Sequence, residues 1–302
     1  MTGQIREVPR FVRPYDTSAL DDAVRARGAA IIERVFSAEL CDRFIDEVRK
    51  YLADNPRSRE RAEKSILGSY QGPETTTLHA LIGRVPVAAE MIVQPDLLGC
   101  AKRILAPLTT SVLLTVAEYM GRDPGQPRQQ LHRDTEAWAH LPLGEDPVAL
   151  TLMCAMSDFT VHNGATWVVL DSHRNPAGST PKWSEAVQAT MSKGDALIFR
   201  SDVFHAGGAN DTAADRREIF SLGYQVGWLR TVENSTLSVP PAMAATLPED
   251  VQELLGYSAE LVLGLYEGGH PKSALTDRVD AENSACVTAP KPESPVEGSI
   301  LR

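Results

Sequence analysis

The sequence predicts a mainly β protein with flanking helices, folded as a barrel or a two-sheet jelly roll of the cupin-like type. Three observations support this fold class. Short apolar and β-branched runs follow one another closely in the middle of the chain, turn-forming residues separate them, and helical patterns precede them. We expect one domain over residues 1–270, with the jelly-roll core at about residues 108–230.

The N-terminal third has the pattern of amphipathic helices. Ser37 suits an N-cap, and apolar residues follow it at every fourth position: Leu40, Phe44, Val48 and Leu52. Pro95 suits the first turn of a second helix. Between the two, residues 67–77 are rich in Gly, Ser and Thr, which indicates a loop or a short strand.

The middle of the chain predicts five strands separated by Gly-, Pro- and Asn-containing turns. The expected strands are residues 112–120, 148–158, 166–170, 196–200 and 218–228. Residues 240–266 predict helix again, with acidic residues placed for a first turn. Residues 271–302 are polar and rich in Pro, Ser and Glu, so we expect a disordered tail.

Composition limits the class of function. The formal charge is -10, which argues against nucleic acid and anionic membranes as partners. The four cysteines lie far apart without a CxxC pair, so neither a zinc knuckle nor a disulfide framework is predicted. The N-terminus lacks the apolar core of a secretory signal, and no apolar run approaches the roughly 20 residues of a membrane span. The sequence therefore predicts a soluble, cytoplasmic protein.

The central chemical motif is His132-Arg133-Asp134. In an extended strand, residues i and i+2 project to the same face, so the imidazole and the carboxylate would point into one space. Two histidines and one carboxylate form the facial triad of non-haem iron(II) oxygenases. A lone HxD usually means a surface pair. Here it follows a Gly- and Pro-rich loop and precedes the strand-rich region, which favours the metal.

His205 is the predicted third ligand. It follows a turn and a buried strand, and Gly207 and Gly208 come directly after it and permit close backbone approach. The other histidines lie near a helix, in polar turn-like segments, at a strand end or beside the tail: His79, His140, His162, His173 and His270. The alternative for any one of them is a structural histidine.

An arginine in the last predicted strand suits an anionic co-substrate. Arg217 alternates with Ile219 and Ser221, so its guanidinium would face inward, where it can bind a carboxylate with two parallel hydrogen bonds. Arg216 would face the other way, and a register slip of one residue would exchange the two. For either arginine alone, a solvated position at the strand end is the alternative.

These motifs, taken in order, resemble the phytanoyl-CoA dioxygenase family. The resemblance rests on HxD, Asn163-Gly164-Ala165-Thr166, Gly194-Asp195, His205 with Gly207-Gly208, and the arginine, and it covers roughly residues 112–228. In particular, the chain resembles fungal members that tailor meroterpenoids and alkaloids, through Trp138 after the HxD motif and the run Tyr224-Gln225-Val226-Gly227-Trp228. The resemblance implies a double-stranded β-helix core.

The resemblance also implies cofactors and roles. Fe(II) would be held by His132, Asp134 and His205; 2-oxoglutarate would be bound by Gln129, Thr166 and Arg217; and O2 would be the oxidant. A carboxylate at Asp134 implies oxygenation, because related halogenases have a small residue there. Some relatives carry a basic residue near the positions of Ser69 and Tyr70, and this chain has no clear counterpart.

The substrate is expected to be a small hydrophobic secondary metabolite such as a meroterpenoid, undergoing hydroxylation, desaturation or rearrangement. Candidate contacts are Tyr70, Leu78, Met120 and Trp138, with a plain core position as the alternative for each. The resemblance suggests a homodimer. Alternative functions are a fatty acyl-CoA hydroxylase, which would need a basic patch; a non-catalytic jelly roll, which would lack a ligand; and a zinc hydrolase, which has no use for a dicarboxylate clamp.

Overall fold

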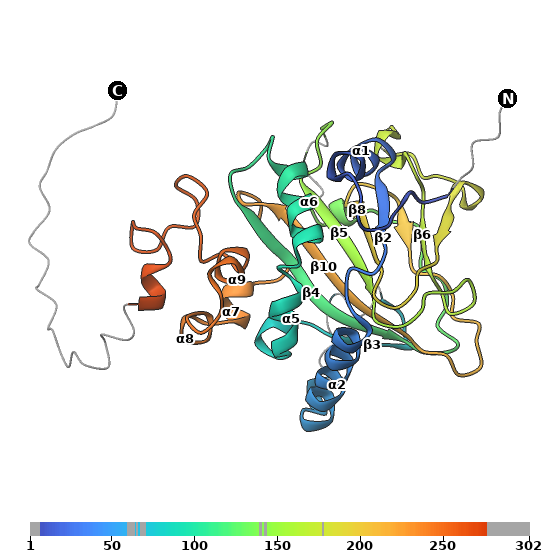
Figure 1. Cartoon of the computed structure of the whole chain (residues 1–302), viewed down its shortest axis with the longest axis horizontal. Coiled ribbons are helices and arrows are strands. Elements are labelled where there is room, and N and C mark those ends of the chain that lie inside the picture. Colours follow the sequence, from blue (N-terminus) through green and yellow to red (C-terminus); the bar gives the residue numbers. More distant parts are fainter. Residues whose placement is uncertain are drawn as a thin grey trace, which may run out of the picture.

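The computed structural model describes residues 7–58, 64, 66, 71–138, 141, 144–176 and 178–276. Its centre is a seven-stranded sheet, and a three-stranded sheet lies on one side of it (Figure 1). The larger sheet has the strand order β1 (Arg10–Phe11), β2 (Ala29–Ile32), β8 (Ala196–Arg200), β5 (Ala149–Ala155), β10 (Arg217–Val226), β4 (Val112–Arg122) and β3 (Thr75–Leu78). The smaller sheet has the order β7 (Val187–Ala189), β6 (Thr166–Val168) and β9 (His205–Ala206).

Pairing is antiparallel throughout the two sheets except for β1, which runs parallel to β2. Two sheets of this kind, flanked by helices, match the jelly-roll expectation. All five predicted strands are present as β4, β5, β6, β8 and β10. The segment expected to be a loop or short strand ends in β3.

Helices cover the outer face of the larger sheet (Figure 1). They are α1 (Thr17–Arg27), α2 (Ala38–Asp54), α5 (Pro86–Met91) and α6 (Pro95–Leu105). Ser37 caps α2 by accepting a hydrogen bond from the Leu40 N–H at 3.2 Å, and Pro95 stands at the first position of α6. Both helix starts predicted from the sequence are confirmed. Short 3-10 turns also occur at η1 (Leu81–Gly83), η2 (Asp134–Trp138), η3 (Ser172–Arg174) and η4 (Trp183–Glu185).

The two faces of the larger sheet belong to two separate cores. Tyr119 and Ala117 of β4 pack outward with the helices, whereas Met120 packs inward with Ile219 and with residues of the smaller sheet. Side chains alternate between the two faces of a strand, so the residues two positions before and after Met120 in β4 also face inward. The space between the two sheets is where the functional side chains meet.

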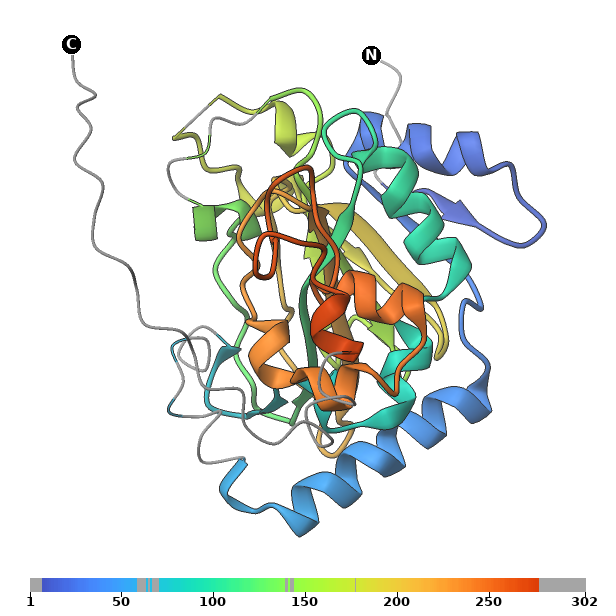
Figure 2. The ribbon, with the colours of Figure 1, turned by 90° about the vertical axis from the view of Figure 1, so that its left-hand side faces the viewer.

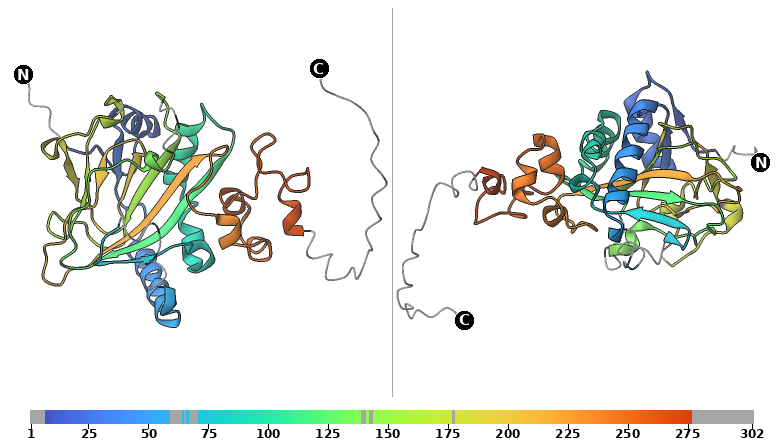
Figure 3. Two further views of the ribbon diagram at one scale, coloured as in Figure 1. Left: turned by 180° about the vertical axis from the view of Figure 1, so that it is seen from behind. Right: turned by 90° about the horizontal axis from the view of Figure 1, so that it is seen from below.

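The C-terminal segment projects from the side opposite the smaller sheet (Figure 3), and in Figure 2 it faces the viewer. It contains α7 (Ser235–Ser238), α8 (Pro241–Ala244) and α9 (Glu249–Leu254). The helix predicted over residues 240–266 is therefore correct only in its first half. Beyond α9 the chain turns repeatedly, because Gly256, Gly264 and Gly268 take positive φ angles, and isolated bridges such as Glu260 to Leu263 replace the helix.

The predicted tail begins inside the region that the structure describes. Residues 271–276 form a turn and a helical segment in which Leu275 is buried, and residues 277–302 lie outside the described part. Within the described ranges, none of the helices combines the length and the apolar character that a membrane crossing requires.

Candidate iron centre and co-substrate site

Two histidines are brought together by a backbone bridge. His132 and His205 exchange both main-chain hydrogen bonds, each 3.0 Å long, and His205 is the first residue of β9. Their rings lie 4.3 Å apart, centre to centre. The bridge fixes the two imidazoles as neighbours before any metal is considered.

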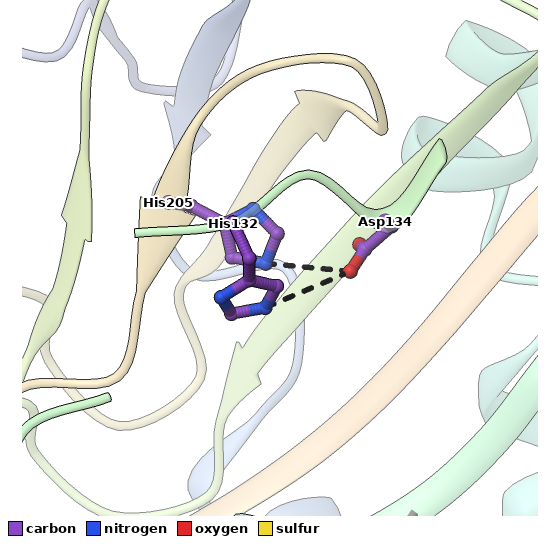
Figure 4. Close-up of side chains that lie close together, drawn as sticks. All are labelled: His132, Asp134 and His205. Atoms are coloured by element: carbon purple, nitrogen blue, oxygen red, sulfur yellow. Dashed lines mark ion pairs between the residues drawn. The ribbon is translucent and has the colours of Figure 1, made fainter. Parts of the chain in front are cut away.

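Asp134 lies close to these rings because of a turn, and not because of the strand alternation that the sequence suggested. The HxD segment is not a continuous strand, because His132 forms a single bridge and Asp134 already begins η2. The turn brings the Oδ1 atom of Asp134 to 3.5 Å from Nε2 of His205 and 4.0 Å from Nε2 of His132 (Figure 4). The predicted proximity is therefore confirmed, but strand alternation is the wrong reason for it.

The hydrogen bonds of the two imidazoles select the tautomer that a metal needs. Nδ1 of His132 lies 2.9 Å from the Gln130 carbonyl, and Nδ1 of His205 lies 3.2 Å from the Val203 carbonyl. A carbonyl oxygen only accepts, so each Nδ1 carries the hydrogen and each Nε2 presents its lone pair to Asp134. In addition, burial lowers the pKa of His205 to about 4, which keeps that ring neutral.

The carboxylate of Asp134 is also oriented by its neighbours. The Thr151 hydroxyl donates to Oδ2 over 2.5 Å and lies 2.9 Å from the Ser201 hydroxyl. Since Oδ2 is held by Thr151, Oδ1 is the oxygen that faces the histidines. The three ligand atoms all lie within 4.8 Å of one another. Two neutral Nε2 atoms and one carboxylate oxygen on one side of a space fit a divalent iron ion.

The ligands differ in their access to solvent. The His205 side chain is 4% exposed, whereas those of His132 and Asp134 are 36% and 34% exposed. One side of the site is therefore formed by the protein interior, and the other is open to incoming molecules. This is the arrangement that a site with vacant metal positions requires.

Two arginines lie side by side at the end of the inner face. Arg217 of β10 is paired in register with Arg122 of β4, and each is 1–2% exposed. No carboxylate pairs with either guanidinium among the residues described, and Nε and Nη1 of Arg217 have no hydrogen-bond partner there. Burial, and then the charge of Arg122, lower the pKa of Arg217 well below its ordinary value. Buried cations of this kind call for an anion.

Arg216 lies on the opposite face, as strand alternation predicts. Its guanidinium pairs with Asp123 at 3.1 Å and lies 3.8 Å from a carboxylate oxygen of Glu218. Arg216 therefore has carboxylate partners already, whereas Arg217 does not. Of the two adjacent arginines, the inward one is the candidate for binding a carboxylate from outside the chain.

Gln129 and Thr166 meet the arginines around Gly207. The Gln129 side-chain oxygen accepts a hydrogen bond of 2.7 Å from the Gly207 N–H, and the Arg122 guanidinium donates to the Gly208 carbonyl over 3.2 Å. Thr166 opens β6, and extending the β6–β9 register by one residue sets it opposite Gly207. A Cβ on Gly207 would stand 2.8 Å from Gln129 and 2.9 Å from Arg122, so only glycine lets these groups approach. The residues predicted for 2-oxoglutarate thus share one neighbourhood.

The substrate candidates have mixed positions. Met120 is buried on the inner face, and Trp138 is partly buried with its indole N–H bonded to the Arg230 carbonyl at 2.9 Å. Leu78 packs in the outer core with the helices, so it is a core residue and not a pocket residue. Tyr70 lies outside the described residues.

Sequence reasoning missed two residues of this region. Arg122 had a signal, since it ends a β-branched and apolar strand directly before Asp123-Pro124-Gly125 and is in step with the inward Met120. Thr151 had none, because a threonine inside an apolar strand is ordinary β sequence. Only the fold sets it beneath Asp134.

The fold and the site together define a class: a jelly-roll metalloenzyme with a His–Asp–His facial triad. The sequence model of the phytanoyl-CoA dioxygenase family matches residues 24–218, which is more than half of the 302 residues, and the chain belongs to this family. It is an Fe(II)- and 2-oxoglutarate-dependent dioxygenase, with His132, Asp134 and His205 as the candidate triad.

Individual relatives agree with this membership. The iron/alpha-ketoglutarate-dependent dioxygenase penM of Penicillium thymicola is 26% identical over 260 residues, covering 84% of this chain and 82% of its own. The dioxygenase swnH1 of Metarhizium robertsii is 27% identical over 275 residues, covering 85% and 88%. Among solved structures, the alpha-ketoglutarate-dependent carbocyclase SnoK from nogalamycin biosynthesis is 18% identical, with a TM-score of 0.58 over 77% of this chain and 93% of its own. That structure shows the shared fold.

Proposed function

We propose that this dioxygenase oxidises a small secondary metabolite, with His132, Asp134 and His205 binding iron(II) and with Arg217 binding the distal carboxylate of 2-oxoglutarate. The observation that carries the proposal is the pair of buried arginines, which lies on the same inner face as the triad and has no carboxylate partner in the described part of the chain. When bound, the iron supplies the oxidation of a substrate C–H bond, coupled to decarboxylation of 2-oxoglutarate to succinate.

Each protein group has a separate task in this reaction. The Nδ1–H bonds of the two histidines keep their Nε2 lone pairs available, and Thr151 keeps one oxygen of Asp134 turned toward the ligand position. Arg217 offers a planar set of N–H donors that matches a carboxylate, and Arg122 adds positive charge beside it. Gln129 and Thr166 are proposed to hold the co-substrate between the arginines and the triad.

The assignment to secondary metabolism rests on the fungal relatives and on the sequence motifs shared with enzymes that tailor meroterpenoids and alkaloids. The identity of the product, whether hydroxylated, desaturated or rearranged, stays open to assay. Formation of a homodimer stays a prediction, and the apolar side chains exposed on the C-terminal segment are consistent with it: Leu261, Val262, Leu263, Leu265 and Tyr266.

The proposal is tested by binding under anaerobic conditions. Iron(II) and then 2-oxoglutarate are added to metal-free protein, and the weak visible charge-transfer band of the chelate is recorded. We expect the band in the wild type, its loss in His132→Ala, and a need for at least about tenfold more 2-oxoglutarate in Arg217→Ala, since a charged hydrogen bond contributes about 1.5–3 kcal/mol. Arg216→Ala is the matched control, because its guanidinium faces away.

Two outcomes would reject the proposal. If no band forms while zinc binds tightly, the zinc hydrolase becomes the better assignment. If Arg216→Ala weakens 2-oxoglutarate binding as much as Arg217→Ala does, the inward arginine is not the anchor. The fatty acyl-CoA alternative is examined with the same protein, by measuring succinate formation with an acyl-CoA and with polycyclic amines and alcohols as substrates.

A further inference from the structure

The inner face of the larger sheet carries a second polar group besides the arginines. Glu118 is in step with Met120 and Arg122 along β4, so its side chain projects between the two sheets. Its register partner on β10 is Ser221, and Met153 of β5 follows on the far side of Ser221. A carboxylate at this depth is unusual, since Glu118 is only 8% exposed.

Only one oxygen of the Glu118 carboxylate has a partner among the described residues. Oε2 accepts a hydrogen bond of 3.0 Å from the Gln71 side chain and lies 3.1 Å from Nδ1 of His79. In the described part of the protein, the hydrogen bond and the ion pair of this side chain both involve Oε2, and Oε1 has no partner. Among the residues that the structure describes, Oε1 of Glu118 is therefore left as an acceptor on the inner face.

Polar groups lead from Glu118 toward the triad. The β4–β10 register shifts between Gly223 and Tyr224, and Thr115 lies at this irregularity with its Oγ1 only 3.3 Å from a Cβ position on Gly223. That hydroxyl is buried and has no partner in the described structure. Gly223 is paired in turn with Thr151, the residue that holds Asp134. A molecule lying on this face would reach from Glu118 to the metal ligands.

Several charged groups lie near Glu118. Glu233 lies close behind His79 and accepts hydrogen bonds from the Ala80 and Ala117 N–H groups. Burial opposes protonation of His79, but the hydrogen bond and the charge of Glu118 outweigh it and raise the pKa of this imidazole. Arg84 is the other cation here: its guanidinium donates to the His79 carbonyl over 2.7 Å, and its charge acts against protonation of His79. Among the described residues, His79 and Gln71 contact only Oε2 of Glu118, so a cation on a ligand can pair with Oε1.

We propose that Glu118 binds a protonated amine of the substrate, so that the natural substrate is a basic, nitrogen-containing metabolite of alkaloid type. This inference rests on the proposed function, because it sets the substrate on the same face as the triad. Oε1 of Glu118 accepts the ammonium N–H, Ser221 is the register partner of Glu118, and the Thr115 hydroxyl lies further along the face, beside Gly223. A purely hydrocarbon skeleton would leave these groups desolvated and unpaired.

The test compares two ligands with the same ring size. Quinolizidine is a bicyclic amine that is protonated at neutral pH, and decahydronaphthalen-1-ol is a neutral bicyclic alcohol. Binding of each to the full chain is measured by calorimetry, both without metal and with iron(II) and 2-oxoglutarate under nitrogen. We expect the amine to bind at least about tenfold more tightly than the alcohol, in line with one charge-assisted hydrogen bond.

Two variants localise the effect. In Glu118→Gln, which keeps the size of the side chain, the preference for the amine should fall to about the level of the alcohol. Glu90→Gln removes an exposed carboxylate elsewhere on the surface and should leave the preference unchanged. The wild-type comparison stands on its own should Glu118→Gln fail to fold.

The outcomes separate this inference from the proposed function. If the amine binds no more tightly than the alcohol, or if Glu118→Gln keeps the preference, the inference is overturned even when the iron and 2-oxoglutarate band forms normally. If the amine preference is present and depends on Glu118 but no band forms, the amine site stands and the co-substrate assignment fails.

Discussion

At the scale of single residues, the site depends on groups that orient the ligands as much as on the ligands themselves. Thr151 holds one oxygen of Asp134 at 2.5 Å, and main-chain carbonyls hold the Nδ1 atoms of both histidines. Of these contacts, only the threonine comes from a side chain and is open to substitution. It is therefore the point at which the orientation of the triad can be tested.

We expect Thr151→Val to weaken iron(II) binding by about 10- to 100-fold, because valine keeps the shape of threonine but cannot donate to Asp134. Thr151→Ser should restore the affinity, since it keeps the hydroxyl. The measurement is the iron(II) dissociation constant by anaerobic titration. Wild-type affinity in the valine variant would show that the hydroxyl does not position the carboxylate.

Two adjacent arginines of β10 also differ in their surroundings, for a reason that is local to the strand. Arg216 and Arg217 have opposite orientations in β10, so one pairs with Asp123 while the other is buried beside Arg122. Alternation along a strand is a local property of the backbone, and the sequence predicted it correctly. The presence of Arg122 next to Arg217 is not local, because it depends on the pairing of β4 with β10.

At the scale of elements, the C-terminal segment packs on the jelly roll through apolar side chains such as Val251 and Leu254, and one carboxylate adds a polar attachment. Glu260 accepts hydrogen bonds from the N–H and hydroxyl groups of Thr110 and Ser111 and from the Thr109 hydroxyl, at 2.7–3.2 Å. Burial alone would raise the pKa of Glu260, but these bonds outweigh it and lower the pKa to about 2. The carboxylate therefore stays ionised while it anchors the segment to the start of β4.

We expect Glu260→Ala to loosen the C-terminal segment without unfolding the core. Amide hydrogen exchange over residues 235–276 should accelerate by at least about tenfold, since several hydrogen bonds to a charged acceptor are lost. Glu249→Ala is the control, because its ion pair with Lys272 is at the surface and contributes little. Equal exchange in the two variants would contradict the role of Glu260.

At the scale of the whole molecule, two histidines are buried in their neutral form. Burial is the main cause that lowers the pKa of His205 to about 4, and burial together with the charge of Arg200 lowers the pKa of His173 to about 4, from an ordinary value of 6.5. Between pH 4 and 6.5 the unfolded chain binds these protons and the folded protein does not. The stability they contribute is therefore full above pH 6.5 and is lost as the pH falls toward 4.

We expect the free energy of unfolding of the metal-free protein to be smaller at pH 5 than at pH 7, as measured by urea denaturation. His173→Phe, which removes a buried ring nitrogen that has no partner in the described structure, should make this difference smaller. His270→Phe replaces an exposed histidine and should leave the difference unchanged. A pH dependence that is unaltered in His173→Phe would assign the effect to other groups.

Much of this architecture could be predicted because it is written in local patterns. Ser37 and Pro95 mark helix starts that the structure confirms, and the expected strand over residues 196–200 coincides with β8. Caps, turn residues and side-chain periodicity act over a few residues, so they can be recognised in the sequence alone. The helix predicted over residues 240–266 failed in its second half, where positive-φ glycines overrode the apolar pattern.

The sequence by itself determined the fold class, the two histidines and the carboxylate of the triad, and the arginine that faces inward. The tertiary structure decided the rest: the turn that carries Asp134 to His205, the pairing that brings Arg122 beside Arg217, and the depth at which Glu118 is buried. These features depend on contacts between residues that are far apart along the chain. Strand register sets such contacts, and no local pattern encodes which strands become neighbours.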